Sequence, residues 1–416
     1  MTIAVIELHD VALRCGTGGQ LIEVPGQALV TPQGIVTGAA ARARAWLEPQ
    51  YSFDQYWQQL GTATLPLASR QARHFADLAH AQLLALHQAA GAPPRVIFAV
   101  PGSFSRDQLA VLLGIAKAVP FSVTGLVDAA LAAGHREVAD VALHIDLLRH
   151  CAVLTTLRRN GTEVFRERTT VLPELGLNRL HDLWARFIAE RFIATHRYDP
   201  LHTGRGEQAL RDALPGWLAT AAGSSELSLV LTGPRGPLPL RLGAAELITA
   251  AEPLYAPLAR AVADADGTAR LLAQGPAELP GLRERLLGLV LPAAATITGG
   301  LAQSEVIAAH PANVLITRLP TAAVAASPTR PHATHLLWRH RAHAIGTGLA
   351  LPPGGTPVGL STTGNADAAI RLERDGTRLR LKTAAADVEI EGDGADLRAG
   401  DRLRIGGEVL ELIEVL

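Results

Sequence analysis

The spacing of apolar residues changes once along this chain, near residue 327. Before that point, apolar runs of strand length alternate with longer stretches in which apolar residues recur at helical spacing. After it, short apolar runs are separated by Gly and Asp-Gly turns. The first pattern predicts an α/β arrangement, and the second predicts a β-sandwich of about 80 residues.

The segment 95–134 gives the clearest local prediction. The apolar run 96–100 is typical of a buried strand, and Pro101-Gly102 ends it. A helix to about residue 119 should follow, then the β-like run 121–123 and a second helix ending at Gly134. The candidate N-caps of the first helix are Ser103, Ser105 and Asp107.

The same patterns predict the remaining elements. Strands are expected at 3–8, 28–30, 35–36, 141–147, 152–158, 163–170, 227–231, 239–242 and 269–272. Helices are expected at 38–47, 70–91, 175–192, 207–221, 244–265 and 282–291. Strands beyond the change of pattern are expected at 335–338, 342–346, 368–372, 378–382, 387–391, 401–405 and 409–415. Asn160-Gly161 predicts a tight hairpin.

Composition narrows the classes of function. With 38 Lys+Arg against 39 Asp+Glu, the formal charge is -1, which argues against binding to nucleic acid or an anionic membrane. Only Cys15 and Cys151 are present, as in proteins of a reducing compartment. The N-terminal residues lack an export-signal pattern, and no apolar run approaches the ~20 residues of a membrane helix. We therefore expect a cytoplasmic protein.

The segment 95–134 also resembles a stretch of the actin-like and DnaK-type heat-shock ATPases, which reads V-P-A-x-F-x-x-x-Q-R and continues toward A-A-A-L-A-Y-G. The matching residues are Val100-Pro101, Phe104, Gln108, Ala129 to Ala132 and Gly134. The resemblance implies a two-lobed α/β fold, and the order of elements follows it to about residue 326. The implied segments are a first lobe at 1–140, a second lobe at 141–326, a linker at 327–334 and a small domain at 335–416.

The end of the chain resembles the end of a forkhead-associated domain. The matching residues are Asp396-Leu397, Gly400-Asp401, Leu403 and Ile405-Gly406. Such domains read phosphothreonine through a G-R pair, an S-x-x-H motif and a late asparagine. Those positions fall here on Gly346-Thr347, on Ala366 and Ala369, and on Glu391-Gly392. A carboxylate would repel an incoming phosphate, so we do not expect phosphopeptide recognition.

The resemblance also implies where a nucleotide would bind. The family holds phosphates with two glycine-rich β-turns, because backbone N–H groups must approach them without an intervening Cβ. At the first turn Glu7 and His9 replace an aspartate and a glycine; at the second, Asp146 is kept. The three glycines of the second turn are replaced by Leu148, Arg149 and His150. The adenosine-binding turn keeps one glycine, Gly275.

A lysine and a glutamate of the family's site also have no counterpart, since the matching positions lie in 57–61 and at Gly125. We therefore predict a pseudo-ATPase without catalytic residues, metal or nucleotide. The alternative is a nucleotide in an altered pose, with Mg-ATP touching Glu7, His9, Asp146, Arg149, His150 and Gly275. Gly16 to Gly19 could then cradle a phosphate, although a plain hairpin turn is the favoured interpretation. A simple strand-end carboxylate is likewise favoured for Asp146.

Weaker candidates have structural interpretations. His335, His340 and His343 do not share a strand face, so a solvated strand is favoured over a metal site. The pair His80 and His87 has no acidic partners, and Cys151 is typical of an inert core thiol. Ser103 lacks the G-x-S-x-G context of a hydrolase nucleophile.

The hypothesis that follows is a non-catalytic, chaperone-like scaffold or adaptor that binds and helps assemble a protein partner. A divergent ATP-binding chaperone is the alternative, and a sensor of another small ligand in the interlobe cleft is a third. A cleft filled by Leu148, Arg149, His150 and Trp57 would count against both ligand-binding hypotheses.

Overall fold

The structure is a computed structural model that describes most of the 416 residues. The described ranges are 3–17, 19–67, 69–265, 269–321, 333–352, 356–359, 368–375, 378–384, 388–391, 397–405 and 408–414. The chain divides into two units, Met1–Ala322 and Ala323–Leu416, and each is described by itself. The predicted mixed α/β content is confirmed, as are small antiparallel sheets near the C-terminus.

A six-stranded sheet forms the first half of unit 1, in the order β16-β8-β7-β1-β2-β3. Its strands are β1 (Ile3–Glu7), β2 (Ala12–Gly16), β3 (Leu21–Pro25), β7 (Arg95–Val100), β8 (Ser122–Asp128) and β16 (Leu315–Ile316). Strands β1, β2 and β3 form an antiparallel meander, and β7 and β8 add parallel to the other side of β1.

The second half repeats this arrangement in a sheet of order β15-β14-β9-β10-β11-β17. Its strands are β9 (Val141–Leu147), β10 (Cys151–Asn160), β11 (Glu163–Pro173), β14 (Ala269–Leu272), β15 (Leu289–Val290) and β17 (Arg318–Pro320). Here too an antiparallel meander, β9 to β11, is extended by two parallel strands beside its first member. The two halves therefore share one topology.

Two short helices pack between the sheets, and each follows directly on a strand of its own sheet. They are α4 (Ala129–Gly134) after β8 and α10 (Ala295–Ala302) after β15. Their backbones approach so closely that a Cβ at Gly299 would lie 1.8 Å from the carbonyl oxygen of Ala132. Val5, Leu157 and other buried apolar residues of both sheets complete this central core.

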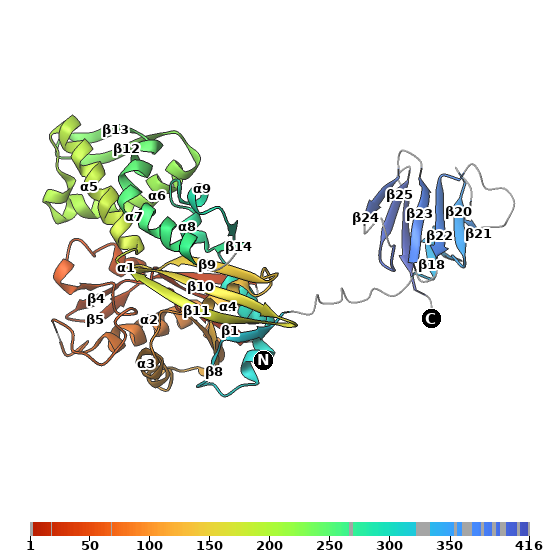
Figure 1. The fold of residues 1–416 in the computed structure, drawn as a ribbon, viewed down its shortest axis with the longest axis horizontal. Coiled ribbons are helices and arrows are strands. Elements are labelled where there is room, and N and C mark those ends of the chain that lie inside the picture. Colours follow the sequence, from red (N-terminus) through yellow and green to blue (C-terminus); the bar gives the residue numbers. More distant parts are fainter. Residues whose placement is uncertain are drawn as a thin grey trace. The chain divides into compact units, whose positions relative to one another are not determined.

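Each half carries a further subdomain at its outer end (Figure 1). In the first, β4 (Ala28–Thr31), β5 (Gly34–Thr37) and β6 (Ser52–Phe53) form a small sheet near α1 (Ala39–Arg42), η1 (Pro49–Tyr51) and α2 (Phe75–Ala89), and α3 (Arg106–Ala116) packs against α2. In the second, the hairpin of β12 (Glu226–Gly233) and β13 (Gly236–Gly243) packs with α5 (Leu177–His196), η2 (Pro200–His202), α6 (Gly204–Gly223) and α7 (Ala244–Asp264). The remaining helices are α8 (Gln274–Ala277), α9 (Leu282–Leu286) and α11 (Ser304–Ala308).

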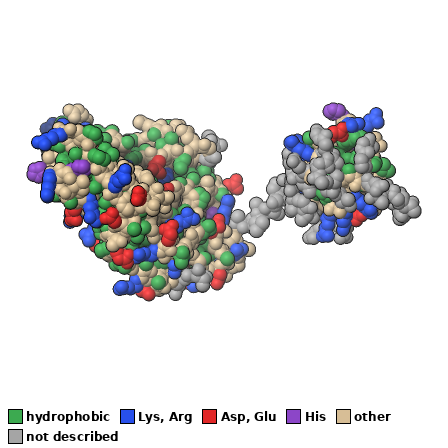
Figure 2. Space-filling view, turned by 90° about the horizontal axis from the view of Figure 1, so that it is seen from above, with side chains coloured by type: hydrophobic (Ala, Val, Ile, Leu, Met, Phe, Trp, Pro, Cys, Tyr) green, Lys and Arg blue, Asp and Glu red, His purple; other side chains and the backbone are tan. Residues whose placement is uncertain are grey.

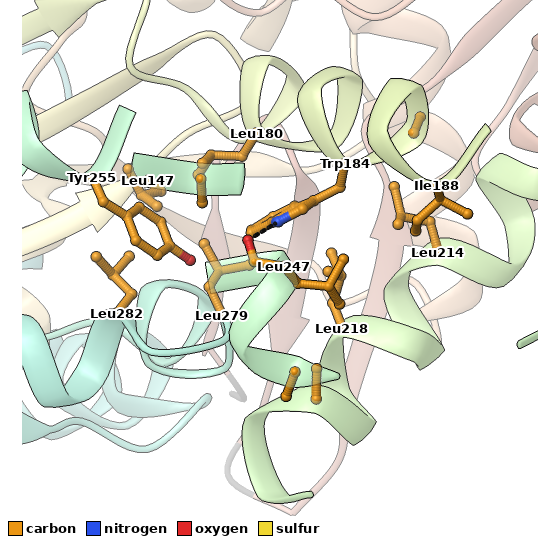
Figure 3. Close-up of a cluster of buried hydrophobic side chains, with 14 of the residues drawn as sticks. Leu147, Leu180, Trp184, Ile188, Leu214, Leu218, Leu247, Tyr255, Leu279 and Leu282 are labelled. Atoms are coloured by element: carbon orange, nitrogen blue, oxygen red, sulfur yellow. Dashed lines mark hydrogen bonds between the residues drawn. The ribbon is translucent and has the colours of Figure 1, made fainter. Parts of the chain in front are cut away.

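A buried tryptophan anchors the core of the second half (Figure 3). The indole N–H of Trp184, on α5, donates to the carbonyl oxygen of Leu247, on α7, at 2.8 Å. The ring of Tyr255 meets that of Trp184 edge-on, and its hydroxyl donates to the Pro280 carbonyl at 2.9 Å. The polar atoms of both rings are thus satisfied within an apolar core.

Most local predictions are confirmed, with corrections at element ends. Ser105 is the N-cap of α3, accepting the N–H of Gln108, and Asn160 pairs with Glu163 across the predicted hairpin turn. The helix predicted at 282–291 is wrong beyond Leu286, because Leu289–Val290 pairs in parallel with β14 instead. The helices predicted at 38–47 and 70–91 are shorter, covering Ala39–Arg42 and Phe75–Ala89.

Unit 2 contains two antiparallel sheets around one apolar core. The first, in the order β19-β18-β26-β25-β24, contains β18 (His335–Trp338), β19 (Arg341–Ala344), β24 (Glu389–Glu391), β25 (Arg402–Ile405) and β26 (Glu408–Ile413). The second, in the order β21-β20-β22-β23, contains β20 (Gly348–Leu351), β21 (Val358–Gly359), β22 (Ile370–Asp375) and β23 (Arg378–Ala384). The sequence prediction missed β20 and β21, and residues 327–332 of the predicted linker lie outside the described residues.

Charge and hydrophobicity on the surface match the balanced composition. Acidic and basic side chains are interspersed on the face drawn in Figure 2. Within the described ranges, no helix has both the length and the apolar character that crossing a bilayer requires.

Candidate functional site

The two turns predicted to face a nucleotide are bonded to each other. One turn joins β1 to β2 and the other joins β9 to β10, at equivalent places in the repeated topology. The carboxylate of Asp10 accepts the backbone N–H of Arg149 at 2.7 Å. The Arg149 guanidinium donates back to the carbonyl oxygens of Asp10 and Val11, at 3.1 and 3.3 Å. We call these contacts, together with the His9–Asp146 pair, the turn bridge.

His9 and Asp146 form an ion pair across the same two turns, with His9 Nε2 3.3 Å from the Asp146 carboxylate. The N–H of Val11 lies 3.3 Å from His9 Nδ1, a bond that only the neutral ring can accept, with its proton on Nε2 toward Asp146. Burial lowers the pKa of His9, but Asp146, Glu7 and Asp10 raise it more strongly, to about 8. Burial raises the pKa of Asp146, whereas His9 lowers it, with a net value of about 2. Asp146 is therefore ionised at neutral pH, and protonation of His9 exchanges the bond from Val11 for a full ion pair with Asp146.

Glu7 belongs to a ladder of charges across three strands. It lies opposite Arg14 on β2, which in turn lies opposite Glu23 on β3. Arg14 donates to Glu7 at 3.2 Å and to Glu23 at 2.7 Å, and the hydroxyl of Thr296 donates to Glu7 at 2.8 Å. The carboxylate of Glu7 is thus engaged within the protein.

His150 makes a second link between the halves. Its Nε2 lies 3.5 Å from the carboxylate of Asp54, which also accepts the side-chain amide of Asn178 at 2.7 Å. Burial raises the pKa of Asp54, but His150 and Arg149 outweigh it and lower the pKa below its usual value. Burial lowers the pKa of His150, while Asp54 raises it above the ordinary histidine value.

Two glycines pack directly against the backbones of the two turns, where any side chain would clash. A Cβ at Gly26 would lie 1.8 Å from the carbonyl oxygen of Asp10, and one at Gly176 would lie 2.3 Å from the carbonyl carbon of His150. Neither glycine belongs to the predicted site. Each holds a backbone against one turn, a role that only the tertiary structure reveals.

A cavity of about 600 Å³ lies beside the turn bridge, with walls from both halves. Of the predicted site residues, Arg149 and Gly275 line it, with Gly275 on α8, where nothing lies within 4 Å of its absent Cβ. Glu7, His9 and Asp146 line an adjoining space of about 80 Å³, which shares Gly275 and other wall residues with the cavity. Trp57, whose presence in the cleft would have counted against a ligand, does not line the cavity, because its indole is buried in the first core and donates to Gln82.

A further cross-link between the two halves lies on the wall of the cavity. Gln208, on α6, accepts the N–H of Trp46 at 2.9 Å and donates to the Arg42 carbonyl at 3.0 Å. The guanidinium of Arg211 stacks 4.2 Å from the centre of the Trp46 indole. The sequence analysis did not predict the contacts of Gln208 or Arg211 with Trp46 and Arg42, because the partners lie on different subdomains.

The other candidates have structural surroundings. The segment Gly16 to Gly19 joins β2 to β3, with Gly16 opposite Leu21, and its described residues do not line the cavity; Gly18 lies outside the described residues. Burial raises the pKa of Cys151 to about 12, as for an inert thiol. In the described part of the chain, no group of three or more His, Cys, Asp and Glu side chains could hold a metal ion.

The phosphopeptide positions of unit 2 are only partly described. Gly346 and Thr347 lie exposed between β19 and β20, and Ala369 is buried. Ala366 and Gly392 lie outside the described residues, as do Asp396 and Gly406 of the matching end motif. Within that motif, Asp401 is buried and its carboxylate accepts the N–H of Arg398 at 2.9 Å, which closes the turn before β25.

Neither the scan against models of known protein families nor the search of curated protein sequences found a match for this chain. The functional proposal therefore rests on the geometry described above.

Proposed function

We propose that residues 1–322 form a two-lobed fold of the actin-like and DnaK-type ATPases that no longer hydrolyses ATP. The chain would then act as a scaffold or adaptor for a protein partner. The repeated meander with its parallel extension, and the helices α4 and α10 between the sheets, support the fold assignment.

The turn bridge carries the functional proposal. A phosphate would need free backbone N–H groups on these turns. The N–H of Arg149 is bonded to Asp10, and that of Leu148 to the Cys151 carbonyl. A nucleotide would have to displace these partners. This supports the proposal that the two turns link the halves of the protein instead of binding phosphate.

Unit 2 would supply a second docking surface in this scaffold. Two antiparallel sheets around one core support its forkhead-associated-like assignment. Exposed Thr347 stands where that family has its phosphate-binding arginine, so docking would not depend on phosphorylation.

Thermal unfolding with Mg-ATP or Mg-ADP, beside a hydrolysis assay, tests this proposal. The scaffold proposal predicts no change of midpoint and no hydrolysis. A ligand at ~100 times its dissociation constant would stabilise the fold by about 2.7 kcal/mol, which is easily detected.

The open cavity favours the second candidate, a divergent ATP-binding chaperone. That function predicts nucleotide-dependent stabilisation and nucleotide-dependent release of a captured partner. Partner capture that is equal with and without Mg-ATP would contradict it.

A further inference from the structure

The charges on the wall of the 600 Å³ cavity are unevenly satisfied. Each carboxylate on the wall has a hydrogen-bond partner. The pairs are Glu23 with Arg14, Asp54 with Asn178, Asp182 with Arg211, Asp212 with Gln208, and Glu278 with Gln274. Glu23, Asp182 and Asp54 lie beside guanidinium groups, whereas Asp212 and Glu278 have a side-chain amide as their partner.

Arg42 is the exception among the arginines of the wall. Arg14, Arg149 and Arg211 all donate to carboxylates or carbonyls, whereas the described residues provide no hydrogen bond or ion pair to the Arg42 guanidinium. Its side chain is exposed at the cavity and free to turn toward a ligand.

His181 marks where the positive charge is concentrated. It lines the cavity on α5, and no described group forms a hydrogen bond with its ring. Burial lowers its pKa most, and Arg149, Arg211 and Arg42 lower it further, to about 3. The ring is thus a neutral donor and acceptor surrounded by three guanidinium groups.

We propose that this cavity binds a small organic monoanion, whose anionic group pairs with Arg42 beside His181. Trp46 and the apolar residues Leu214, Pro215 and Leu218 of α6 provide a wall for the body of the ligand. A polyanion such as a nucleotide triphosphate fits poorly, because the five wall carboxylates would lie around its further charges. A carboxylate and a phosphate diester, each singly charged at neutral pH, share the required chemistry.

Binding of matched probes to the full chain tests this inference by titration calorimetry. Phenylacetate and methyl phenyl phosphate, each singly charged at neutral pH, supply the two kinds of anion, and phenylacetamide is the uncharged counterpart. We expect at least one anion to bind about tenfold more tightly than the amide, the size of one charge-assisted hydrogen bond. Which anion binds more tightly distinguishes the carboxylate from the phosphate source.

The variant Arg42→Gln should remove this preference, so that the anions bind no better than the amide. Arg44→Gln is the matched control, since Arg44 belongs to the same segment, pairs with Glu48 and does not line the cavity. Absence of anion binding, equal affinity for anion and amide, or an unchanged preference in Arg42→Gln would each overturn the proposal. ATP hydrolysis would instead overturn the proposed scaffold function, so the two failures are distinguishable.

Discussion

The carboxylate of Asp10 accepts the backbone N–H of Arg149 at 2.7 Å, although 139 positions separate the two residues. This bond joins the corresponding turns of the two sheets. Because Asp10 is buried, the bond should contribute to the stability of unit 1 as a whole.

Replacing Asp10 by Ala should therefore destabilise the protein by about 1–3 kcal/mol, the cost of leaving a buried donor without a partner. Asp10→Asn keeps an acceptor oxygen in the same place and should cost clearly less. Chemical denaturation of both variants measures the difference. Equal losses in the two variants would show that packing of the side chain, rather than its hydrogen bond, matters.

His9 should make stability depend on pH. Its folded pKa of about 8 lies above the ordinary 6.5, so its contribution is complete below pH 6.5 and is lost as pH rises through about 8. The raised pKa of His150 acts in the same direction, and the lowered values of His144 and His181 act in the opposite one.

The comparison of wild type with His9→Gln isolates the His9 contribution from those of the other histidines. Urea unfolding across this range should show wild type losing about 1–2 kcal/mol that the variant never had. A constant difference between the two proteins at all pH values would exclude the ion pair with Asp146 as the source.

Because α4 and α10 approach so closely, adding one methyl group at Gly299 should strongly destabilise the protein. Gly299→Ala would place a Cβ 1.8 Å from the Ala132 carbonyl oxygen, so one helix must shift, at a cost of about 1–3 kcal/mol or more. In α3, Gly114 has nothing within 4 Å of its absent Cβ. Gly114→Ala should therefore stabilise the protein by up to ~1 kcal/mol through helix propensity. The midpoint of thermal unfolding should fall in Gly299→Ala and rise in Gly114→Ala.

The buried carboxylate of Asp128 predicts a dependence on one arginine. Asp128 is fully buried, caps α4 through the N–H of Leu131, and accepts Arg166 at 2.8 Å. Arg166→Ala should cost about 3–5 kcal/mol, because it leaves a buried charge unpaired. Adding Asp128→Asn should restore part of the loss, since the amide oxygen can still cap the helix. A double variant as unstable as Arg166→Ala would refute this explanation.

Features set by neighbouring residues were predictable, and those set by distant partners were not. The strand at 96–100 and the Asn160-Gly161 turn follow from local patterns, and both are present. The stretch 282–291 reads as a helix, but its second part is drawn into a parallel pair with β14. All four residues of β20 are buried, so the strand shows no alternation that could reveal it.

The candidate site shows the same division. Its turns could be located from sequence order, so Asp146 and Arg149 were predictable as residues of the second turn, whereas their bonds to the first turn were not. Asp10 and Asp54 were missed, because their partners lie in the other half of unit 1. That the protein binds no nucleotide stays a prediction.

The contact between Gly299 and Ala132 also has a mechanical meaning. Each helix follows a strand of its own sheet, so this backbone contact joins the two halves at one tightly packed point. The contact could act as a hinge between the halves. The turn bridge and the Gln208 cross-link would then limit rotation about that hinge. The angle between the halves would change only when one of these links breaks. A protein partner of the proposed scaffold could then bind one angle in preference to another.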